Sequence, residues 1–397
     1  MQATTILGTS NAARHKMRFG IRQRDRLSHV YIIGKTGVGK STLLGNMMRQ
    51  DLHHGHGFCL IDPHGDLVER MYQGVPEDRR DDVLYFNVPD RTQPYGYNPL
   101  RFVREDRRAL ACSGMLDVMK KMWPDAWGVN MEHILRNALF ALLETPGSAL
   151  PDIVRLLDDK EYRRHVTARL RNATVKHFWQ HEYTSYSFQK RSDGAGPILN
   201  KIGAFLADPH VCKIVTAPEH DLHFRQIMDD GKVLLVNLAK GQIGEDAAGL
   251  LGGLLVTTLG LASFTRQDLV ETERRDFYLY LDEFQNFTTR SMANMTSELR
   301  KYHVGLVLAH QYLFQLDPDV REAVLGNAGT IISFRLGARD AAYLAQEFQP
   351  EFSQLNFLRL PNYDIYLRLM IDGRPSKPFS ATTLEGSSFD WPLHTKN

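Results

Sequence analysis

The sequence predicts an α/β protein with a mostly parallel sheet, and three observations lead to this prediction. Short apolar runs, typical of buried strands, alternate with segments of helical periodicity along much of the 397 residues. A glycine-rich loop follows one of the first runs, and two adjacent acids close a later run, FYLYLDE, that begins at Phe277. This length suits one large domain with an insertion, or two domains.

The glycine-rich loop lies in HVYIIGKTGVGKSTLL, between a strand-like run and a segment of helical spacing. Gly34 to Ser41 matches G-x-x-x-x-G-K-[ST] at every fixed position. Its glycines let backbone N–H groups face a phosphate, Lys40 reaches the β- and γ-phosphates, and the Ser41 hydroxyl binds Mg²⁺. The residues expected to bind a nucleotide are Gly34, Thr36, Gly37, Val38, Gly39, Lys40, Ser41 and Thr42.

Asp282 and Glu283 come directly after the apolar run FYLYL. Burying an unpaired carboxylate is costly, so acids at the end of a buried strand usually meet a cation or have a chemical task. Beside a phosphate loop, Asp282 is expected to hold Mg²⁺ together with Ser41, and Glu283 to orient or deprotonate the attacking water. The alternative, a surface turn with two solvated acids, does not explain the continuous apolar run.

Further apolar runs predict the other strands: FCLID, VLYFNV, KVLLVNL, VGLVLAHQ and TIISFRLG, which begin at Phe58, Val83, Lys232, Val304 and Thr330. Ligands of such sheets bind at the carboxyl ends of the strands. We therefore expect Asp62, Asp282 and Gln311 to lie near Gly34. Gln311 is expected to act as a sensor that hydrogen-bonds the attacking water or the γ-phosphate.

Helical segments dominate between about Phe102 and Arg225, which predicts an all-α insertion within the α/β core. Within it, Tyr183 to Pro197 is polar and contains glycines, so a mobile loop is expected there. The expected division is a basic arm over 1–26, the first part of the core over 27–101, the insertion over 102–225, the second part of the core over 226–384, and a tail over 385–397.

Net charge and cysteine content restrict the function only weakly. The net charge of +2 does not by itself point to any class of partner. Basic residues nevertheless concentrate between Arg14 and Arg26 and between Arg163 and His177. Such patches attract phosphate backbones or are simply solvated faces. Three cysteines, far apart in the sequence, favour a reducing, cytoplasmic setting.

Two segments have alternative interpretations. The uncharged stretch from Ala247 to Phe264 has the length of a membrane helix, but its glycines and its place between predicted strands favour a helix buried against the sheet. Histidines between His53 and His56, with Cys59, could bind a metal. Histidines near a helix end need no metal, and we expect that simpler role.

With the phosphate loop, IDPHGD, YLDEF and LAHQ in this order, the chain resembles the HerA–FtsK superfamily of ring-forming ATPases. It is most similar to TraG/TraD-like conjugative coupling ATPases and HerA-like DNA translocases, from about Arg26 to Thr383. The resemblance implies a RecA-like P-loop NTPase core with ATP and Mg²⁺ as cofactors. It also implies a homohexamer that hydrolyses ATP at subunit interfaces and threads double-stranded DNA through its pore.

The resemblance also implies an arginine finger. RKYHVGLVLAHQ is similar in spacing to the family segment that joins this finger to the sensor glutamine, so Arg300 would reach the ATP of the next subunit. Arg335, near a strand end, is the second candidate, and an exposed helix residue is the alternative interpretation of Arg300. The candidates for DNA contact are Lys190, Arg191, Lys201 and Lys240.

The chain departs from the family at its start. Coupling proteins usually begin with transmembrane helices and HerA proteins with a small β-barrel, whereas fewer than about thirty residues precede the first predicted strand here. We expect no integral membrane segment, and a separate nuclease, relaxase or other effector as partner. Two other functions stay open: a type IV secretion-type export ATPase, and an ATP-gated ring scaffold that recruits a nuclease or effector against mobile DNA.

Overall fold

The computed structural model describes residues 4–11, 16–216 and 220–385. Within these residues one sheet of eleven strands forms the core. The strands in spatial order are β2 (Arg18–Arg22), β1 (Thr4–Ser10), β15 (Phe379–Thr383), β12 (Asp364–Arg368), β11 (Thr330–Ser333), β3 (Val30–Ile33), β10 (Val304–His310), β9 (Phe277–Leu281), β4 (Gly57–Asp62), β8 (Val233–Asn237) and β5 (Val83–Asn87). From β11 to β5 all neighbours pair in parallel, which confirms the predicted fold class.

Helices cover both faces of the parallel part. One face carries α2 (Lys40–His54) and α3 (Asp66–Gln73), and the other carries α12 (Phe224–Asp230), α14 (Glu245–Phe264), α15 (Arg290–Leu299) and α16 (Pro318–Asn327). Side chains of a strand alternate between the faces. Tyr278 and Tyr280 of β9 pack with α2, whereas Leu279 and Leu281 pack with α14. Burial on both faces explains why these strands are continuously apolar.

The segment expected to be a basic arm is part of the sheet, so the expectation of a first strand near His29 is wrong. β1 and β2 form an antiparallel hairpin, and β1 pairs with β15. In β1 the side chains of Thr5 and Leu7 are buried and those of Thr4 and Ile6 are partly exposed, which is the alternation of a strand with one face toward the core. Its threonines and glycine hide that pattern among polar residues, while Arg18 and Arg22 of β2 stay exposed.

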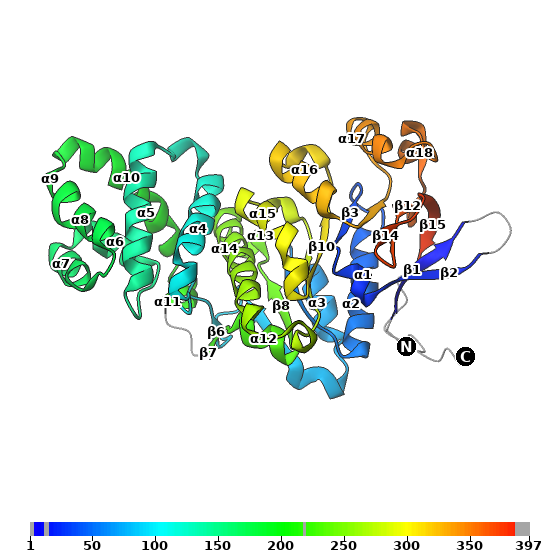
Figure 1. The fold of residues 1–397 in the computed structure, drawn as a ribbon, viewed down its shortest axis with the longest axis horizontal. Coiled ribbons are helices and arrows are strands. Elements are labelled where there is room, and N and C mark those ends of the chain that lie inside the picture. Colours follow the sequence, from blue (N-terminus) through cyan, green and yellow to red (C-terminus); the bar gives the residue numbers. More distant parts are fainter. Residues whose placement is uncertain (1–3, 12–15, 217–219, 386–397) are drawn as a thin grey trace.

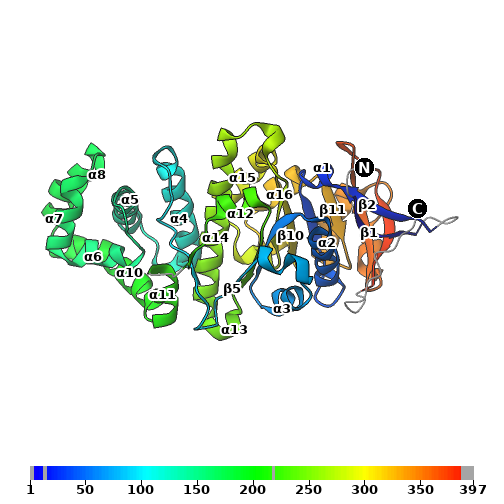
Figure 2. The ribbon, with the colours of Figure 1, turned by 90° about the horizontal axis from the view of Figure 1, so that it is seen from below.

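The expected insertion is a helical domain that lies beside the core (Figures 1 and 2). Its helices are α4 (Arg108–Met122), α5 (Val129–Glu144), α6 (Pro151–Asp158), α7 (Lys160–Arg169), α8 (Ala173–His177), α9 (Tyr183–Ser185), α10 (Phe188–Leu206) and α11 (Pro209–Thr216). The short strands β6 (Tyr95–Gly96) and β7 (His220–Asp221) pair where the domain joins the core.

The apolar helix α14 forms the contact between core and helical domain. A Cβ atom on Gly253 would lie 2.7 Å from Val118 Cγ1, and one on Gly114 would lie 2.5 Å from Thr257 Cγ2. Glycines on both helices therefore permit the close approach of α14 to α4. By length and composition α14 could cross a membrane, but most of its apolar window is buried in this fold. Its burial agrees with the interpretation of a core helix.

The expectation of a mobile loop over Tyr183 to Pro197 is wrong, because most of that segment begins α10. The Ser187 side chain caps the helix by accepting from the Lys190 backbone N–H at 3.2 Å. Gly194 faces α5, where a Cβ atom would lie 2.5 Å from Ile134 Cδ1. Gly194 therefore serves helix packing instead of a turn.

A buried ion pair joins the N-terminal hairpin to the core. Both side chains of the Arg26–Asp51 pair are fully buried, with Arg26 Nη1 donating to Asp51 Oδ1 at 2.6 Å and Nη2 to Oδ2 at 2.9 Å. The Tyr280 hydroxyl donates to Asp51 Oδ2 at 2.5 Å, and Thr5 accepts from Arg26 at 2.9 Å. The pair thus links α1 (Gln23–Arg26), α2, β9 and β1.

Removing one partner of this pair should be strongly destabilising, because the other charge stays buried and unpaired. We expect Asp51→Ala to lower the free energy of unfolding by about 3–5 kcal/mol. The matched control is Arg22→Ala, which breaks the Arg22–Asp372 pair between half-exposed side chains and should cost at most about 1 kcal/mol. Urea unfolding followed by circular dichroism measures both. An Asp51→Ala cost as small as that of the control would contradict this account.

His29 is a buried, neutral histidine at the amino end of β3. The Leu306 backbone N–H donates to His29 Nδ1 at 3.0 Å, so Nε2 carries the proton and donates to the Thr296 carbonyl at 2.7 Å. Burial lowers the pKa of His29 to about 4. Protonation of Nδ1 would break the bond from Leu306.

This histidine predicts a loss of stability in mild acid. Between its unfolded pKa near 6.5 and the folded value, the unfolded chain binds more protons, so stability falls as the pH falls. From pH 7 to pH 5, His29 should contribute about 2 kcal/mol of this loss. His29→Asn, whose side chain tolerates the left-handed backbone at this position, should remove that share in urea unfolding at the two pH values. An unchanged pH dependence would assign the effect to other groups.

Candidate nucleotide site

The phosphate loop connects β3 to α2 at the carboxyl edge of the sheet. Gly37 has φ of 75° and Gly39 has φ of 117°, backbone conformations that residues other than glycine rarely adopt. Lys40 Nζ donates to the carbonyls of Gly34 at 2.7 Å and Lys35 at 3.0 Å, so the lysine lies across its own loop. Burial lowers the pKa of Lys40, and the nearby acids oppose this shift.

The acidic pair lies against the loop, as the motifs predict. The Ser41 hydroxyl donates to Asp282 Oδ2 at 3.4 Å. Burial raises the pKa of Asp282 to about 6, and the charges of Asp62 and Glu283 add to the increase. A buried carboxylate with acidic neighbours is suited to a cation, and a hydroxyl with a carboxylate oxygen are ligands that Mg²⁺ accepts. Ser41 and Asp282 therefore fit the expected Mg²⁺.

Glu283 and Gln311 are in direct contact. Gln311 Nε2 donates to Glu283 Oε1 at 2.5 Å, and the Thr36 hydroxyl of the loop donates to Gln311 Oε1 at 2.8 Å. Gln285, which the sequence motifs do not single out, donates from Nε2 to Glu283 Oε2 at 2.6 Å. Glu283 has φ of 48°, a conformation that is uncommon for a glutamate and is often found at functional sites.

Gln285 also contacts the helical domain. Its backbone carbonyl accepts from Lys121 Nζ of α4 at 2.5 Å. Six residues later, the Ser291 backbone N–H donates to Asp117 of the same helix at 3.2 Å. The segment behind the acidic pair therefore rests on α4.

Asp62 lies near the acidic pair, as expected, but its oxygens are used by backbone groups. Its Oδ1 accepts from the His64 N–H at 2.8 Å, and Oδ2 accepts from the Leu67 N–H at 2.9 Å. These bonds hold the turn before α3. Within the described part of the chain, no group of three or more His, Cys, Asp or Glu side chains surrounds a metal position.

The two arginine candidates lie at opposite ends of the parallel strands: Arg335 follows β11, at the carboxyl ends, and Arg300 precedes β10, at the amino ends. The Arg335 carbonyl accepts from the Lys35 N–H at 3.0 Å, and its guanidinium donates to Leu360 O at 3.2 Å and Asn362 Oδ1 at 2.9 Å. Arg300 is exposed and precedes β10, whereas Gln311 follows β10. A strand of this length spans roughly 20 Å. Arg300 therefore cannot reach the phosphate loop of its own chain.

The four lysines and arginines proposed for DNA contact come from two separate regions. Lys190, Arg191 and Lys201 lie on α10 of the helical domain, and Lys240 begins α13 (Lys240–Ile243) after β8. Lys190 Nζ lies 3.8 Å from the Tyr186 ring centroid, and Lys240 Nζ lies 3.7 Å from Glu245 Oε1. These residues do not share one element.

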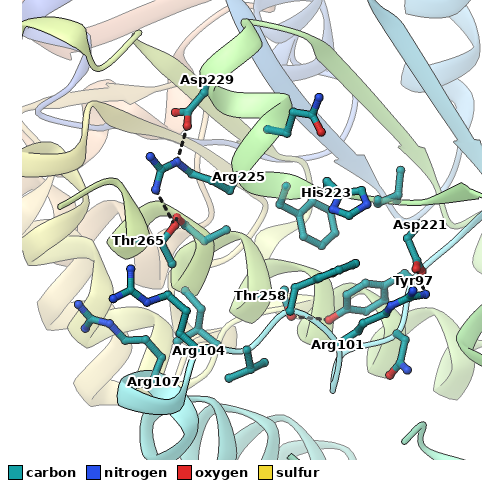
Figure 3. A pocket seen from close by; sticks show the side chains of 18 of the residues that line it. Tyr97, Arg101, Arg104, Arg107, Asp221, His223, Arg225, Asp229, Thr258 and Thr265 are labelled. Carbon is teal, nitrogen blue, oxygen red and sulfur yellow. Dashed lines mark hydrogen bonds and ion pairs between the residues drawn. The ribbon is translucent and has the colours of Figure 1, made fainter. Parts of the chain in front are cut away.

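A further pocket of about 630 Å³ lies at the junction of core and helical domain, away from the phosphate loop (Figure 3). Arg225 of α12 crosses it, donating to Thr265 Oγ1 at 3.0 Å and to Asp268 at 2.8 Å. Tyr97 bonds Thr258 of α14 on the other side. Its arginines are matched by aspartates, which is typical of a structural joint.

Fold and phosphate loop together are those of P-loop NTPases, and comparisons with known proteins show which of them this chain resembles. Residues 13–102 match the family model described as the central domain of the helicase HerA. The bacterial conjugative coupling protein TrwBdeltaN70 is similar in structure, with a TM-score of 0.66 at 16% identity over 98% of this chain and 90% of that chain. VirB4 of Thermoanaerobacter pseudethanolicus gives 0.63 at 14% identity over 96% of each chain. No curated protein matched. The resemblance to HerA–FtsK and TraG-like ATPases is thereby confirmed.

Proposed function

We propose that the protein is an ATP-driven motor that moves double-stranded DNA through a ring of identical subunits, with a homohexamer as the expected assembly. One observation carries the proposal. The carboxyl ends of the parallel strands bring together Lys40, Asp282, Glu283 and Gln311, while Arg300 lies at the amino ends. Such a subunit has the groups for hydrolysis on one side, except for an arginine finger, and it carries that arginine on the other side.

The residues at the loop have distinct tasks in hydrolysis. The loop N–H groups and Lys40 bind the phosphates, while Ser41 and Asp282 hold Mg²⁺, which neutralises charge on the β- and γ-phosphates. Glu283 accepts a proton from the attacking water, and Gln311, already bonded to Glu283, orients that water. Structures of TrwB with ADP and Mg²⁺ and with a non-hydrolysable ATP analogue support these cofactors.

Arg300 is proposed to act in the neighbouring subunit. Its guanidinium is exposed, and its own phosphate loop is out of reach, so it can stabilise transition-state charge only on a nucleotide bound by another chain. Hydrolysis then depends on assembly, which suits a ring motor. The match to the helicase HerA model and the similarity to a conjugative coupling protein support DNA as the transported molecule.

The proposal also includes contacts with DNA and a protein partner. Motors of this kind contact the phosphate backbone, so scattered cations such as Lys190, Arg191, Lys201 and Lys240 are sufficient. A nuclease, relaxase or other effector is the expected protein partner, as it was from the family resemblance. A type IV secretion-type export ATPase is the competing function, and the similarity of this chain in fold to VirB4 is consistent with it.

Steady-state ATP hydrolysis with and without long linear double-stranded DNA tests the proposal. We expect DNA to stimulate turnover, and Glu283→Gln to bind ATP but hydrolyse it at least roughly a hundredfold more slowly, because a general base contributes that much. Near-normal turnover by Glu283→Gln would remove this residue from its role. Robust turnover that ignores DNA would favour the export ATPase.

Mixing two inactive variants tests the position of the finger. Arg300→Ala and Lys40→Ala should each lose hydrolysis, and a mixture should regain part of it, since the intact loop of one can meet the intact arginine of the other. The control mixture replaces Arg300→Ala with Arg335→Ala. Mixed rings that recover activity only with Arg335→Ala would make Arg335 the finger.

A further inference from the structure

We propose that the Tyr363 ring is the platform on which the base of the bound nucleotide stacks. The inference rests on the proposed function, because it takes the phosphate loop to bind a nucleotide. No motif in the sequence marks Tyr363, which lies between α18 (Gln354–Arg359) and β12.

Tyr363 is held directly against the phosphate loop. Its backbone N–H donates to the Val38 carbonyl at 2.8 Å, and its own carbonyl accepts from the Thr383 N–H at 2.8 Å. A Cβ atom on Gly39 would lie 2.8 Å from Tyr363 Cδ1, so the ring lies at the first turn of α2. The residue has φ of 67° and is still 42% exposed. A large aromatic side chain is thus kept in an uncommon backbone conformation and open to solvent.

The order of the strands places Tyr363 on the nucleoside side of the loop. The loop follows β3, whose neighbours are β10 on one side and β11 on the other. Gln311 and Glu283 come from β10 and β9, so the γ-phosphate must face that side to meet the attacking water. The other end of the nucleotide then leaves toward β11 and β12, where Tyr363 lies.

Arg335 and Asn362 hold this platform in place. The guanidinium of Arg335 spans Leu360 O and Asn362 Oδ1, and its carbonyl accepts from Lys35 of the loop. These bonds tie the segment before Tyr363 to the phosphate loop on the flank opposite Gln311. In this arrangement Arg335 is a positioning residue that acts through Tyr363.

Calorimetry with two ligands separates a base platform from a merely structural contact. The ligands are ATP and inorganic tripolyphosphate, each with Mg²⁺, and tripolyphosphate has phosphates but no base. Removing a stacking partner costs about 1–3 kcal/mol, so Tyr363→Asn should weaken ATP binding roughly 5- to 150-fold. Asparagine tolerates the backbone conformation of this position. Tyr363→Phe, which keeps the ring, should bind ATP within about twofold of wild type.

Tripolyphosphate should bind wild type and both variants equally. Equal weakening of both ligands by Tyr363→Asn would overturn the proposal, because the ring would then only support the loop. Unchanged ATP binding by Tyr363→Asn would also overturn it, since the base would lie elsewhere. A wild-type protein that binds tripolyphosphate but not ATP contradicts the platform, whereas one that binds neither contradicts the proposed function itself.

Discussion

The buried ion pair between Arg26 and Asp51 fixes the relative positions of the elements that form the site. Asp51 lies on α2 about three turns beyond Lys40, and Tyr280, which donates to Asp51, lies two residues before Asp282 on β9. The phosphate-binding end of α2 and the acidic end of β9 are therefore held by the same carboxylate. Arg26 supplies the compensating charge from the N-terminal segment. The hairpin of β1 and β2 therefore helps to hold α2 and β9 in their relative positions.

Strong local patterns made the central fold predictable from the sequence. Both-sided burial makes the parallel strands continuously apolar, and the glycine-rich loop constrains the turn between β3 and α2. The hairpin was not predictable in the same way, because TTILGTS mixes threonine and glycine into a strand whose side chains alternate between buried and partly exposed. The first half of α10 was missed because its glycines indicate a turn, and only the facing Ile134 of α5 explains Gly194.

The residues of the candidate site likewise fall into those that the sequence predicts and those that only the fold brings together. Spacing identified Lys40, Ser41, Asp282 and Glu283, because each follows a strand end or a motif. It could not show that Gln285 shares Glu283 with Gln311, or that Tyr363 touches Gly39, since both contacts join segments that only the folded chain brings together. Nor could it separate Arg300 from Arg335. Both lie near strand ends, and the direction of the strands in the folded sheet places Arg300 at the amino ends and Arg335 at the carboxyl ends.

Gln285 has a consequence for how the two parts of the molecule communicate. Its amide holds the Glu283 carboxylate, and its backbone carbonyl holds Lys121 of the helical domain. One residue thus joins Glu283, the proposed general base, to the helical domain. A shift of this peptide that accompanies rearrangement of Glu283 must either carry α4 with it or break the bond to Lys121. Through Gln285, the position of the Glu283 carboxylate is coupled to that of α4.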